Sequence, residues 1–223
     1  MIINYIFIAV ISYLLGSFPF ALWLVRIYTK KDLREGGSKN TGALNTLRIV
    51  SKEKGKVMGV IFFLLAFILD ASKAAIAIII AMNIIPFSPI WAVTIATFFA
   101  VLGHNHSIFL KFKGGRGAAS LMGAMLYLDW RVFFGWLLIV LLSMIIFEML
   151  LGGKFNKKLI KHAISEQIIG RLIGEVFAVY WIYFFNIIVF YPIAPATILV
   201  LIAHKDRITE QVRKMRNKNY FND

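Results

Sequence analysis

The residues best suited to chemistry lie in two segments rich in glycine and basic residues, and the first spans residues 32–48. It contains Ser38, Asn40, Asn45 and Arg48 among its glycines. Small residues allow backbone N–H groups to converge on an anion, and an arginine can donate two parallel hydrogen bonds to phosphate or carboxylate. A flexible, solvated loop would have the same composition, because basic loops beside a membrane are also attracted to anionic lipid. Both interpretations stay open for this segment.

The second segment, residues 103–117, indicates a phosphate site more sharply. It begins Gly103-His104-Asn105-His106 and ends Lys111-Phe112-Lys113-Gly114-Gly115-Arg116-Gly117. An apolar run follows directly, and the N-terminus of a helix attracts phosphate through its free N–H groups and its dipole. The pattern Gly-x-x-x-x-Gly-Lys-Ser/Thr is absent, which argues against a nucleotide triphosphatase. His104 and His106 have no acidic residue or third histidine nearby, so we expect no metal site here.

Asp70 and Lys73 stand three residues apart inside an apolar run. A charge at the centre of a bilayer costs roughly 2.5–3.5 kcal/mol on insertion scales, so such a pair requires a reason. With this spacing the two side chains can meet on one face of a helix and cancel much of the cost. Alternatively, the pair supports a functional site from inside a helical bundle.

The composition is that of a membrane protein. The chain has 223 residues, of which 60% are hydrophobic and only 16% are charged, whereas soluble domains carry about 25% charged residues. Its 25 Lys and Arg against 11 Asp and Glu give a net charge of +14, which favours a partner rich in phosphate. The apolar background favours membrane lipid over nucleic acid as that partner. Cysteine is absent, so the sequence offers neither disulfides nor thiolate metal ligands.

Several apolar runs approach or exceed the roughly 20 residues that a helix needs to cross a bilayer. They cover residues 2–25, 57–82, 90–110 and 132–151, and residues 163–203 have the length for two more crossings. A shorter run, residues 118–128, predicts a half-helix. A cleavable signal peptide is the alternative for residues 2–25, but this run exceeds the usual roughly 7–15 apolar residues and has no basic residue before it.

The distribution of Lys and Arg predicts the orientation, because cytoplasmic loops of membrane proteins hold an excess of both. Residues 26–56, 111–116, 154–171 and 205–218 together hold 23 of the 25. An even number of crossings must separate each cytoplasmic segment from the next, which requires the half-helix to pair with residues 132–151. We therefore predict seven membrane segments, with the N-terminus outside and the C-terminus in the cytoplasm. Residues 1–203 would form one transmembrane helical domain and residues 204–223 a basic cytoplasmic tail.

His204 begins this predicted tail and is followed by Lys205, Asp206 and Arg207. A lone histidine in such a place is usually interfacial. His204 gains interest because the predicted topology puts it on the same side as both glycine-rich segments.

These landmarks resemble a known family, the membrane glycerol-3-phosphate acyltransferases that use acyl phosphate as donor in bacterial phospholipid synthesis. Gly16-Ser17-Phe18-Pro19-Phe20-Ala21 resembles the family's opening Gly-Ser-Ile-Pro-Phe-Ala, and the loop up to Arg48 resembles its Gly-Ser-Gly-Asn-x-Gly-Ala-Thr-Asn-x-x-Arg. Residues 103–117 resemble Gly-His-x-x-x-x-Phe-x-x-Phe-Lys-Gly-Gly-Lys-Gly, the most specific match. Asp70 and Lys73 also match, and His204 falls where the third motif's histidine belongs.

The resemblance implies an all-α integral membrane protein, a seven-segment helical bundle with at least one short half-helix. It implies transfer of a fatty acyl group from acyl phosphate to the 1-hydroxyl of glycerol 3-phosphate, giving lysophosphatidate and phosphate without an acyl-enzyme. We expect no cofactor. The reacting centre would include Ser38, Arg48 and His204, with Asp70 and Lys73 in support. The substrate-binding residues would be Asn40, Asn45, His104, Asn105, Lys111, Lys113, Gly114, Gly115, Arg116 and Gly117. The active site would face the cytoplasm at the cell membrane, with a functional link to the enzyme that makes acyl phosphate.

The chain departs from the family pattern at several positions. The substitutions are Lys39 for a glycine, Leu44 for a threonine, Ala74 for a glycine, Arg116 for a lysine and Arg207 for an asparagine. In addition, residues 149–168 are extra and rich in lysine, which favours an interfacial helix with Glu166 and Arg171 facing outward. An altered acceptor or donor, or a loss of activity, is therefore an alternative to the family's reaction.

Two readings from other classes compete with an enzyme. A transporter or channel for a phosphorylated solute would also place basic residues beside broken helices, although the sequence has neither an internal repeat nor a matching pair of interrupted helices in two halves. A structural partner of lipid enzymes is the other reading, supported only by the basic residues 213–218, which typically adhere to membranes.

Overall fold

The structure, a computed structural model, describes residues 1–87, 89–151 and 167–216, and every regular element in these ranges is helical. The all-α prediction is confirmed. The elements in chain order are α1 (Ile2–Ser17), α2 (Phe20–Thr29), α3 (Ala43–Lys54), α4 (Lys56–Ile84), α5 (Ile90–Asn105), η1 (Ile108–Leu110), α6 (Ala118–Leu128), α7 (Trp130–Leu150), α9 (Ile168–Phe185), α10 (Ile187–Ile202) and α11 (Lys205–Arg216).

The apolar helices fall where the sequence predicts membrane segments. Among the described residues, five are long and apolar enough to span a bilayer: α1 with α2, α4, α5 with η1, α7 and α9. A sixth is obtained if α10 and α11, which meet at a bend of 52°, count as one span, and α6 is a shorter apolar helix. The protein is an integral membrane protein. The count of seven segments stays a prediction.

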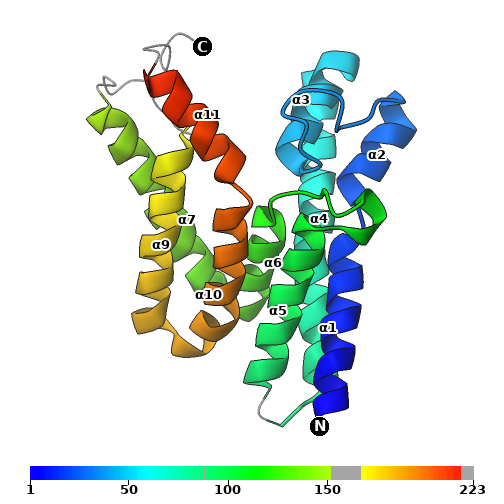
Figure 1. Ribbon diagram of the computed structural model, residues 1–223, viewed down its shortest axis with the longest axis vertical. Helices are drawn as coiled ribbons and strands as arrows, with labels where there is room; N and C mark the ends of the chain where they lie inside the picture. The colour runs from blue at the N-terminus through cyan, green and yellow to red at the C-terminus, as the bar shows by residue number, and fades with distance from the viewer. Residues whose placement is uncertain (88, 152–166, 217–223) are drawn as a thin grey trace.

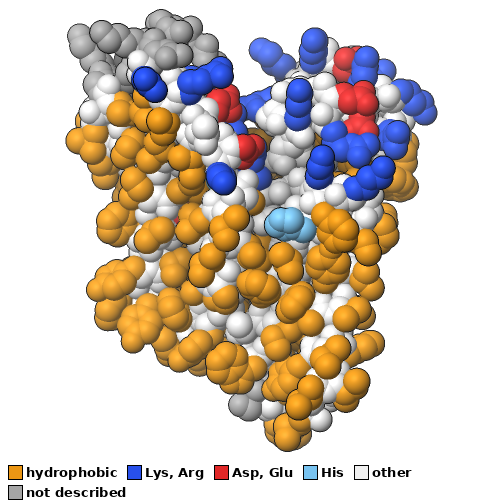
Figure 2. Space-filling model, viewed as in Figure 1, with side chains coloured by type: hydrophobic (Ala, Val, Ile, Leu, Met, Phe, Trp, Pro, Cys, Tyr) orange, Lys and Arg blue, Asp and Glu red, His pale blue; other side chains and the backbone are white. Residues whose placement is uncertain are grey.

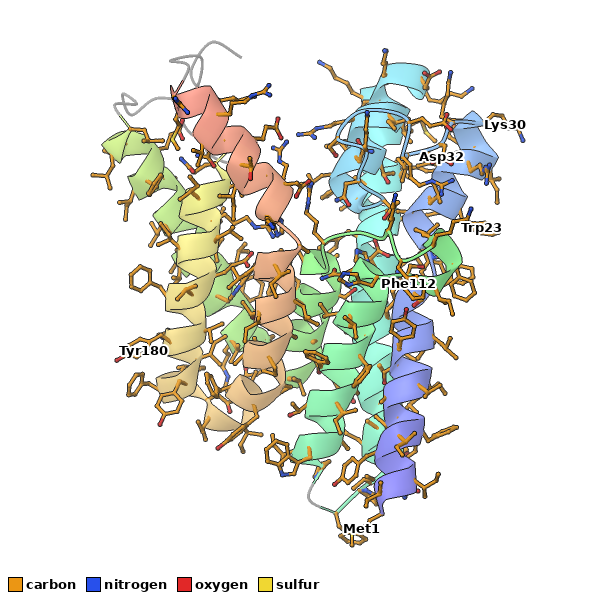
Figure 3. The ribbon with its side chains drawn as sticks, viewed as in Figure 1. Met1, Trp23, Lys30, Asp32, Phe112 and Tyr180 are labelled. Carbon is orange, nitrogen blue, oxygen red and sulfur yellow. The ribbon has the colours of Figure 1, made fainter. Side chains whose placement is uncertain are left out.

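The two ends of the bundle carry different elements (Figure 1). The N-terminus lies at one end, while α3, the outer part of α2 and α11 lie at the other. Figure 2 shows Lys and Arg side chains gathered at the end that carries α3 and α11, with hydrophobic side chains covering most of the visible face below them. Trp23 and Tyr180 point away from the bundle (Figure 3) and are 56% and 64% exposed, as suits side chains that face lipid. Which end faces the cytoplasm stays a prediction.

Local backbone chemistry explains where the first helices begin and end. Pro19 separates α1 from α2, because proline lacks the N–H that a continuous helix requires. Gly55 separates α3 from α4 with a φ of 90°, a conformation that other residues rarely adopt. These breaks place α2, α3 and the loop between them at the basic end of the bundle.

Small residues bring the helices around the second glycine-rich segment into close contact. A β-carbon on Gly16 of α1 would lie 2.1 Å from the carbonyl oxygen of Ala100 in α5. A β-carbon on Gly123 of α6 would lie 2.0 Å from the carbonyl oxygen of Ala71 in α4. Such close backbone approaches are a common basis of helix packing in membranes. The helices on either side of the segment are therefore closely packed, α5 against α1 and α6 against α4.

The C-terminal helices form a second group, in which α7, α9 and α10 pack together and α10 also contacts α5 and α6. Asp129 caps α7 and Asn186 caps α10, and the Asn186 Nδ2 donates to Asp129 Oδ2 over 3.1 Å. At the opposite end, α11 contacts α9, and its Gln211 is 3% exposed. The division of the chain at residue 203 stays a prediction.

Arg171 corrects one expectation about the lysine-rich region, since it does not face outward. Its Nε donates to Glu175 Oε1 over 3.0 Å, and the Arg171 side chain is 16% exposed while that of Glu175 is fully buried. The two residues are one helical turn apart, and a buried carboxylate without a cation would cost several kcal/mol, on the order of 3–5. Residues 152–166, including Glu166, lie outside the described residues.

Candidate active site

The second glycine-rich segment folds back along the end of α5. The Gly114 N–H donates to the carbonyl of Asn105 over 3.0 Å, and the Gly115 N–H donates to that of His104 over 2.8 Å. A β-carbon on Gly114 would lie 2.1 Å from the His104 carbonyl oxygen, and one on Gly115 would lie 2.1 Å from the imidazole Nε2 of His104. These glycines therefore allow close packing, and their amides are already bonded within the protein.

The helix start predicted after this segment is present. Helix α6 begins at Ala118, and Gly117 precedes it with a left-handed φ of 77°. No side chain caps this helix, so its leading N–H groups are available to an anion at the basic end. The N–H groups of Gly114 and Gly115 are already bonded, whereas the first amides of α6 have no side-chain cap. Substrate contacts for the glycines of this segment stay a prediction.

Arg116 is separated from α6 only by Gly117, and it connects this helix to α11. Its Nη2 donates to Asp206 Oδ2 over 2.8 Å, across 90 positions of sequence. The Arg116 side chain is 17% exposed and that of Asp206 is 68% exposed. The second glycine-rich segment and the start of α11 are thus held together by one ion pair.

His204 lies at the bend between α10 and α11 and is 2% exposed. Its Nδ1 is 2.7 Å from the carbonyl oxygen of Val200. A carbonyl only accepts hydrogen bonds, so Nδ1 carries the proton and Nε2 has the free lone pair. The charges of Arg171, Arg116 and Asp206 act on the imidazole.

Asn45 organises the first glycine-rich segment from within. Its side chain is buried, and Nδ2 lies within 2.8–3.1 Å of the carbonyl oxygens of Leu33, Gly36 and Asn40. The Ser38 N–H donates to Asn45 Oδ1 over 2.9 Å. The segment is therefore an ordered loop, and the predicted binding residue Asn45 acts on its backbone. Substrate contacts for Ser38 and Asn40 stay a prediction.

The two arginines of this segment have different surroundings: Arg34 is paired with a carboxylate, whereas Arg48 lines a cavity. Arg34 donates to both carboxylate oxygens of Asp32, and the hydrogen bond from Arg34 lowers the pKa of Asp32. Lys30 and Asp32 lie at the basic end (Figure 3). Arg48 is exposed and lines an open cavity of about 470 Å³. Its other lining residues are Lys31, Glu35, Gly36, Gly37, Ile49, Lys52 and Glu53.

A separate, much smaller cavity lies beneath the second segment. Lys73 Nζ is 2.7 Å from Asp70 Oδ1, which confirms that the pair meets on one helix face. His104 Nδ1 is 3.8 Å from the same carboxylate oxygen, and all three side chains are at most 7% exposed. The residues lining this cavity of about 10 Å³ are Gly16, Ser17, Phe18, Pro19, Thr41, Asp70, Lys73, His104, Ser107 and Leu110. A supporting role for Asp70 and Lys73 in function stays a prediction.

The predicted site residues thus form three groups at the basic end of the bundle. His104, Asp70 and Lys73 surround the small cavity under Gly115, while Arg116 and His204 lie near α11. Arg48 lines the larger cavity, which shares no residue with the smaller one. Asn105 joins α5 to α10, because its Nδ2 donates to the Leu199 carbonyl over 3.1 Å. Lys111 and Lys113 are exposed.

Some residues that fix the site were missed by sequence reasoning. The Ser107 hydroxyl donates to the Ser17 carbonyl, and the Tyr13 hydroxyl donates to the His106 carbonyl over 2.6 Å, so that α1 holds the turn after α5. The place of Ser17 just before Pro19 was the available signal, because the broken helix exposes its carbonyl.

Over the ranges that the structure describes, no three His, Asp or Glu side chains gather closely enough to hold a metal ion.

Comparisons with known proteins agree on one family. The pattern of the glycerol-3-phosphate acyltransferase family matches residues 6–214. Among curated relatives, the glycerol-3-phosphate acyltransferase of Streptococcus gordonii is 34% identical over 220 residues, covering 96% of this chain and 92% of the relative. That of Streptococcus sanguinis is 31% identical, covering 93% of this chain and 88% of the relative.

Solved structures indicate the same family. PlsY (YgiH), an integral membrane glycerol 3-phosphate acyltransferase, matches in its glycerol 3-phosphate form with a TM-score of 0.69 and 26% identity, covering 95% of this chain and 93% of that one. Its lysophosphatidic acid form matches with a TM-score of 0.67 and 25% identity. The sequence motifs, the helical fold and these comparisons together place the chain in the membrane glycerol-3-phosphate acyltransferase family.

Proposed function

We propose that this protein transfers a fatty acyl group from acyl phosphate to the 1-hydroxyl of glycerol 3-phosphate, giving lysophosphatidate and inorganic phosphate. The reaction takes place at the cytoplasmic face of the cell membrane, because the basic end of the bundle is the end that positive-inside orientation puts there. The protein then depends on the enzyme that makes acyl phosphate for its donor.

The acceptor and the product are supported by the related PlsY, which has been crystallised in a glycerol 3-phosphate form and a lysophosphatidic acid form. In this chain, the uncapped start of α6 and the guanidinium of Arg116 offer hydrogen-bond donors to a phosphate at the basic end. The larger cavity beside Arg48, with Lys31 and Lys52, offers positive charge to a second phosphate.

The proposed mechanism depends on the tautomer of His204. With Nδ1 donating to Val200, Nε2 has the lone pair that can accept a proton from the acceptor's hydroxyl. The hydroxyl oxygen attacks the acyl carbonyl carbon, the new ester C–O bond forms, and the bond between that carbon and the phosphate oxygen breaks. Arg48 and nearby lysines stabilise the negative charge on the departing phosphate. The hydroxyl proton goes to His204 or to the departing phosphate, and both routes fit this balance.

Purified protein in detergent, supplied with acyl phosphate and labelled glycerol 3-phosphate, tests the proposal. Labelled lysophosphatidate and one phosphate per turnover are expected. Parallel reactions with acyl-CoA as donor and with glycerol 1-phosphate as acceptor identify both substrates. No product alongside an active relative from Streptococcus gordonii would overturn the proposal, and a preference for either replacement substrate would revise it.

A further inference from the structure

The ion pair between Arg116 and Asp206 puts a carboxylate on a guanidinium that the proposed function assigns to phosphate. The distance between Nη2 and Oδ2 is 2.8 Å. A carboxylate and a phosphate present similar oxygen pairs to an arginine, so both compete for the same N–H groups. Only Gly117 separates Arg116 from the N-terminus of α6, and helix N-termini attract anions.

Asp206 is held at this position by the anchoring of α11. Gln211 lies further along the same helix and is 3% exposed. Its Oε1 accepts hydrogen bonds from the N–H groups of Ile168 and Ile169 over 2.8 and 2.9 Å, and its Nε2 donates to Gln167 Oε1 over 2.6 Å. The buried amide therefore fixes α11 on the first turn of α9. The contact between Asp206 and Arg116 follows from this fixed helix rather than from two freely moving surface chains.

The neighbouring acidic residue of α11 has a different partner. Glu210 Oε2 accepts a hydrogen bond from Arg207 Nη1 over 2.8 Å and is 45% exposed. Asp206 and Glu210 lie one helical turn apart and carry the same charge, but in the described part of the chain only Asp206 forms an ion pair with the glycine-rich segment. The chain thus offers a matched pair of carboxylates.

We propose that Asp206 sets the affinity of the anion site by occupying Arg116, so that a substrate phosphate has to displace it. This inference rests on the proposed function, which assigns Arg116 to phosphate. Substrate binding then exchanges one anion for another at the same guanidinium. Removing the carboxylate of Asp206 leaves Arg116 open and strengthens phosphate binding.

The test compares Asp206→Asn with Glu210→Gln, since each removes one negative charge from α11. The probe is inorganic phosphate, and its dissociation constant is measured by isothermal titration calorimetry on the full chain in detergent. Asp206→Asn is expected to tighten binding by about two- to fivefold, which is the range that a mostly exposed ion pair contributes. The gain is expected to shrink at high salt. Glu210→Gln is expected to bind phosphate as the wild type does.

Steady-state kinetics identify whether Arg116 binds the phosphate of the acceptor or that of the donor. A lower KM for glycerol 3-phosphate alone assigns the site to the acceptor, and a lower KM for acyl phosphate alone assigns it to the donor. Unchanged or weaker phosphate binding by Asp206→Asn, or equal tightening by Glu210→Gln, overturns the inference. Asp206→Ala has to repeat the result, and thermal unfolding confirms that each variant is folded. If wild type shows no turnover but Asp206→Asn still tightens phosphate binding, the proposed function fails and the competition stands.

Discussion

The α-carbon of Gly115 lies directly against the imidazole of His104, so that a β-carbon on residue 115 would be 2.1 Å from Nε2. His104 has little room to retreat, because it is 8% exposed and its Nδ1 faces Asp70 at 3.8 Å. Packing alone therefore requires a glycine at this position, independently of any hydrogen bond that its N–H makes.

Gly115→Ala is therefore expected to lower both stability and turnover. Adding a methyl group to a packed site typically costs about 1–3 kcal/mol, and the displaced imidazole would shift the segment that leads into α6. Thermal unfolding in detergent and the acyltransferase assay measure the two effects. In the double variant Gly115→Ala with His104→Ala, the clash is removed and the unfolding temperature is expected to recover. Wild-type behaviour of Gly115→Ala would contradict the packing role.

His204→Gln is expected to reduce kcat by about 10²–10⁴-fold, the usual contribution of a general base. Glutamine can still donate to the Val200 carbonyl, but it has no basic nitrogen to accept the hydroxyl proton. A structural role would instead appear as a lower unfolding temperature, so thermal unfolding is the control. Retained turnover would assign the proton to the departing phosphate.

Arg48→Lys is expected to retain only a small part of the activity, and Arg48→Ala to abolish it. Lysine keeps the charge at the larger cavity but cannot donate two parallel hydrogen bonds to a phosphate. The effect should appear mainly in the kinetics with acyl phosphate, because the proposed role is on the donor's phosphate. Lys52→Ala, in the same cavity wall, serves as the comparison. Full activity of Arg48→Ala would remove this cavity from the mechanism.

The sequence predicts the membrane segments well, because length and hydropathy are properties of each helix alone. Residues 118–128 were predicted as a half-helix and form α6 with those bounds. The ion pair of Asp70 and Lys73 was also predictable, since three residues along a helix bring two side chains together. Residue types alone pointed to both glycine-rich segments, and the predicted topology and the resemblance to the family added His204.

Contacts between distant parts of the chain were not predictable in the same way. The pair of Arg116 and Asp206 joins residues 90 positions apart, and they meet because α10 packs on α5 and α6 and α11 packs on α9. Likewise, Asn45 has the residue type of a substrate ligand, but its burial directs its amide to the loop backbone. The outward position predicted for Arg171 was wrong, because Glu175 is buried one turn away and pairs with it.

Asn45→Asp is expected to destabilise the first glycine-rich segment strongly. The change replaces the amide nitrogen near three backbone carbonyl oxygens with a carboxylate oxygen that only accepts hydrogen bonds. Losing several buried hydrogen bonds should cost roughly 2–4 kcal/mol. Unfolding of the variant and its activity are measured together. Asn83→Asp changes an exposed amide that makes one local hydrogen bond to Ile79, and it should have little effect. An equal loss in both variants would contradict the role of Asn45.

The ion pair of Asp129 and Arg131, at the end of the bundle away from His204, predicts how the stability of the protein depends on pH. The hydrogen bond from the Arg131 side chain lowers the pKa of Asp129 to about 2, with further help from Asn186. Because this pKa lies below the ordinary value of 3.8, the ionised carboxylate stabilises the folded protein above about pH 4. That contribution is lost as pH falls towards 2.

Asp129→Asn keeps a side chain that can cap α7 but removes the charge. The variant is therefore expected to be less stable than the wild type at pH 7, and the difference should vanish as pH falls from 4 to 2. Unfolding by denaturant at a series of pH values measures this difference directly, because the other carboxylates are common to both proteins. Turnover at pH 7 should be unaffected in the folded variant, since Asp129 lies at the end of the bundle away from His204. A stability difference that persists at pH 2 would show that the charge of Asp129 is not its cause.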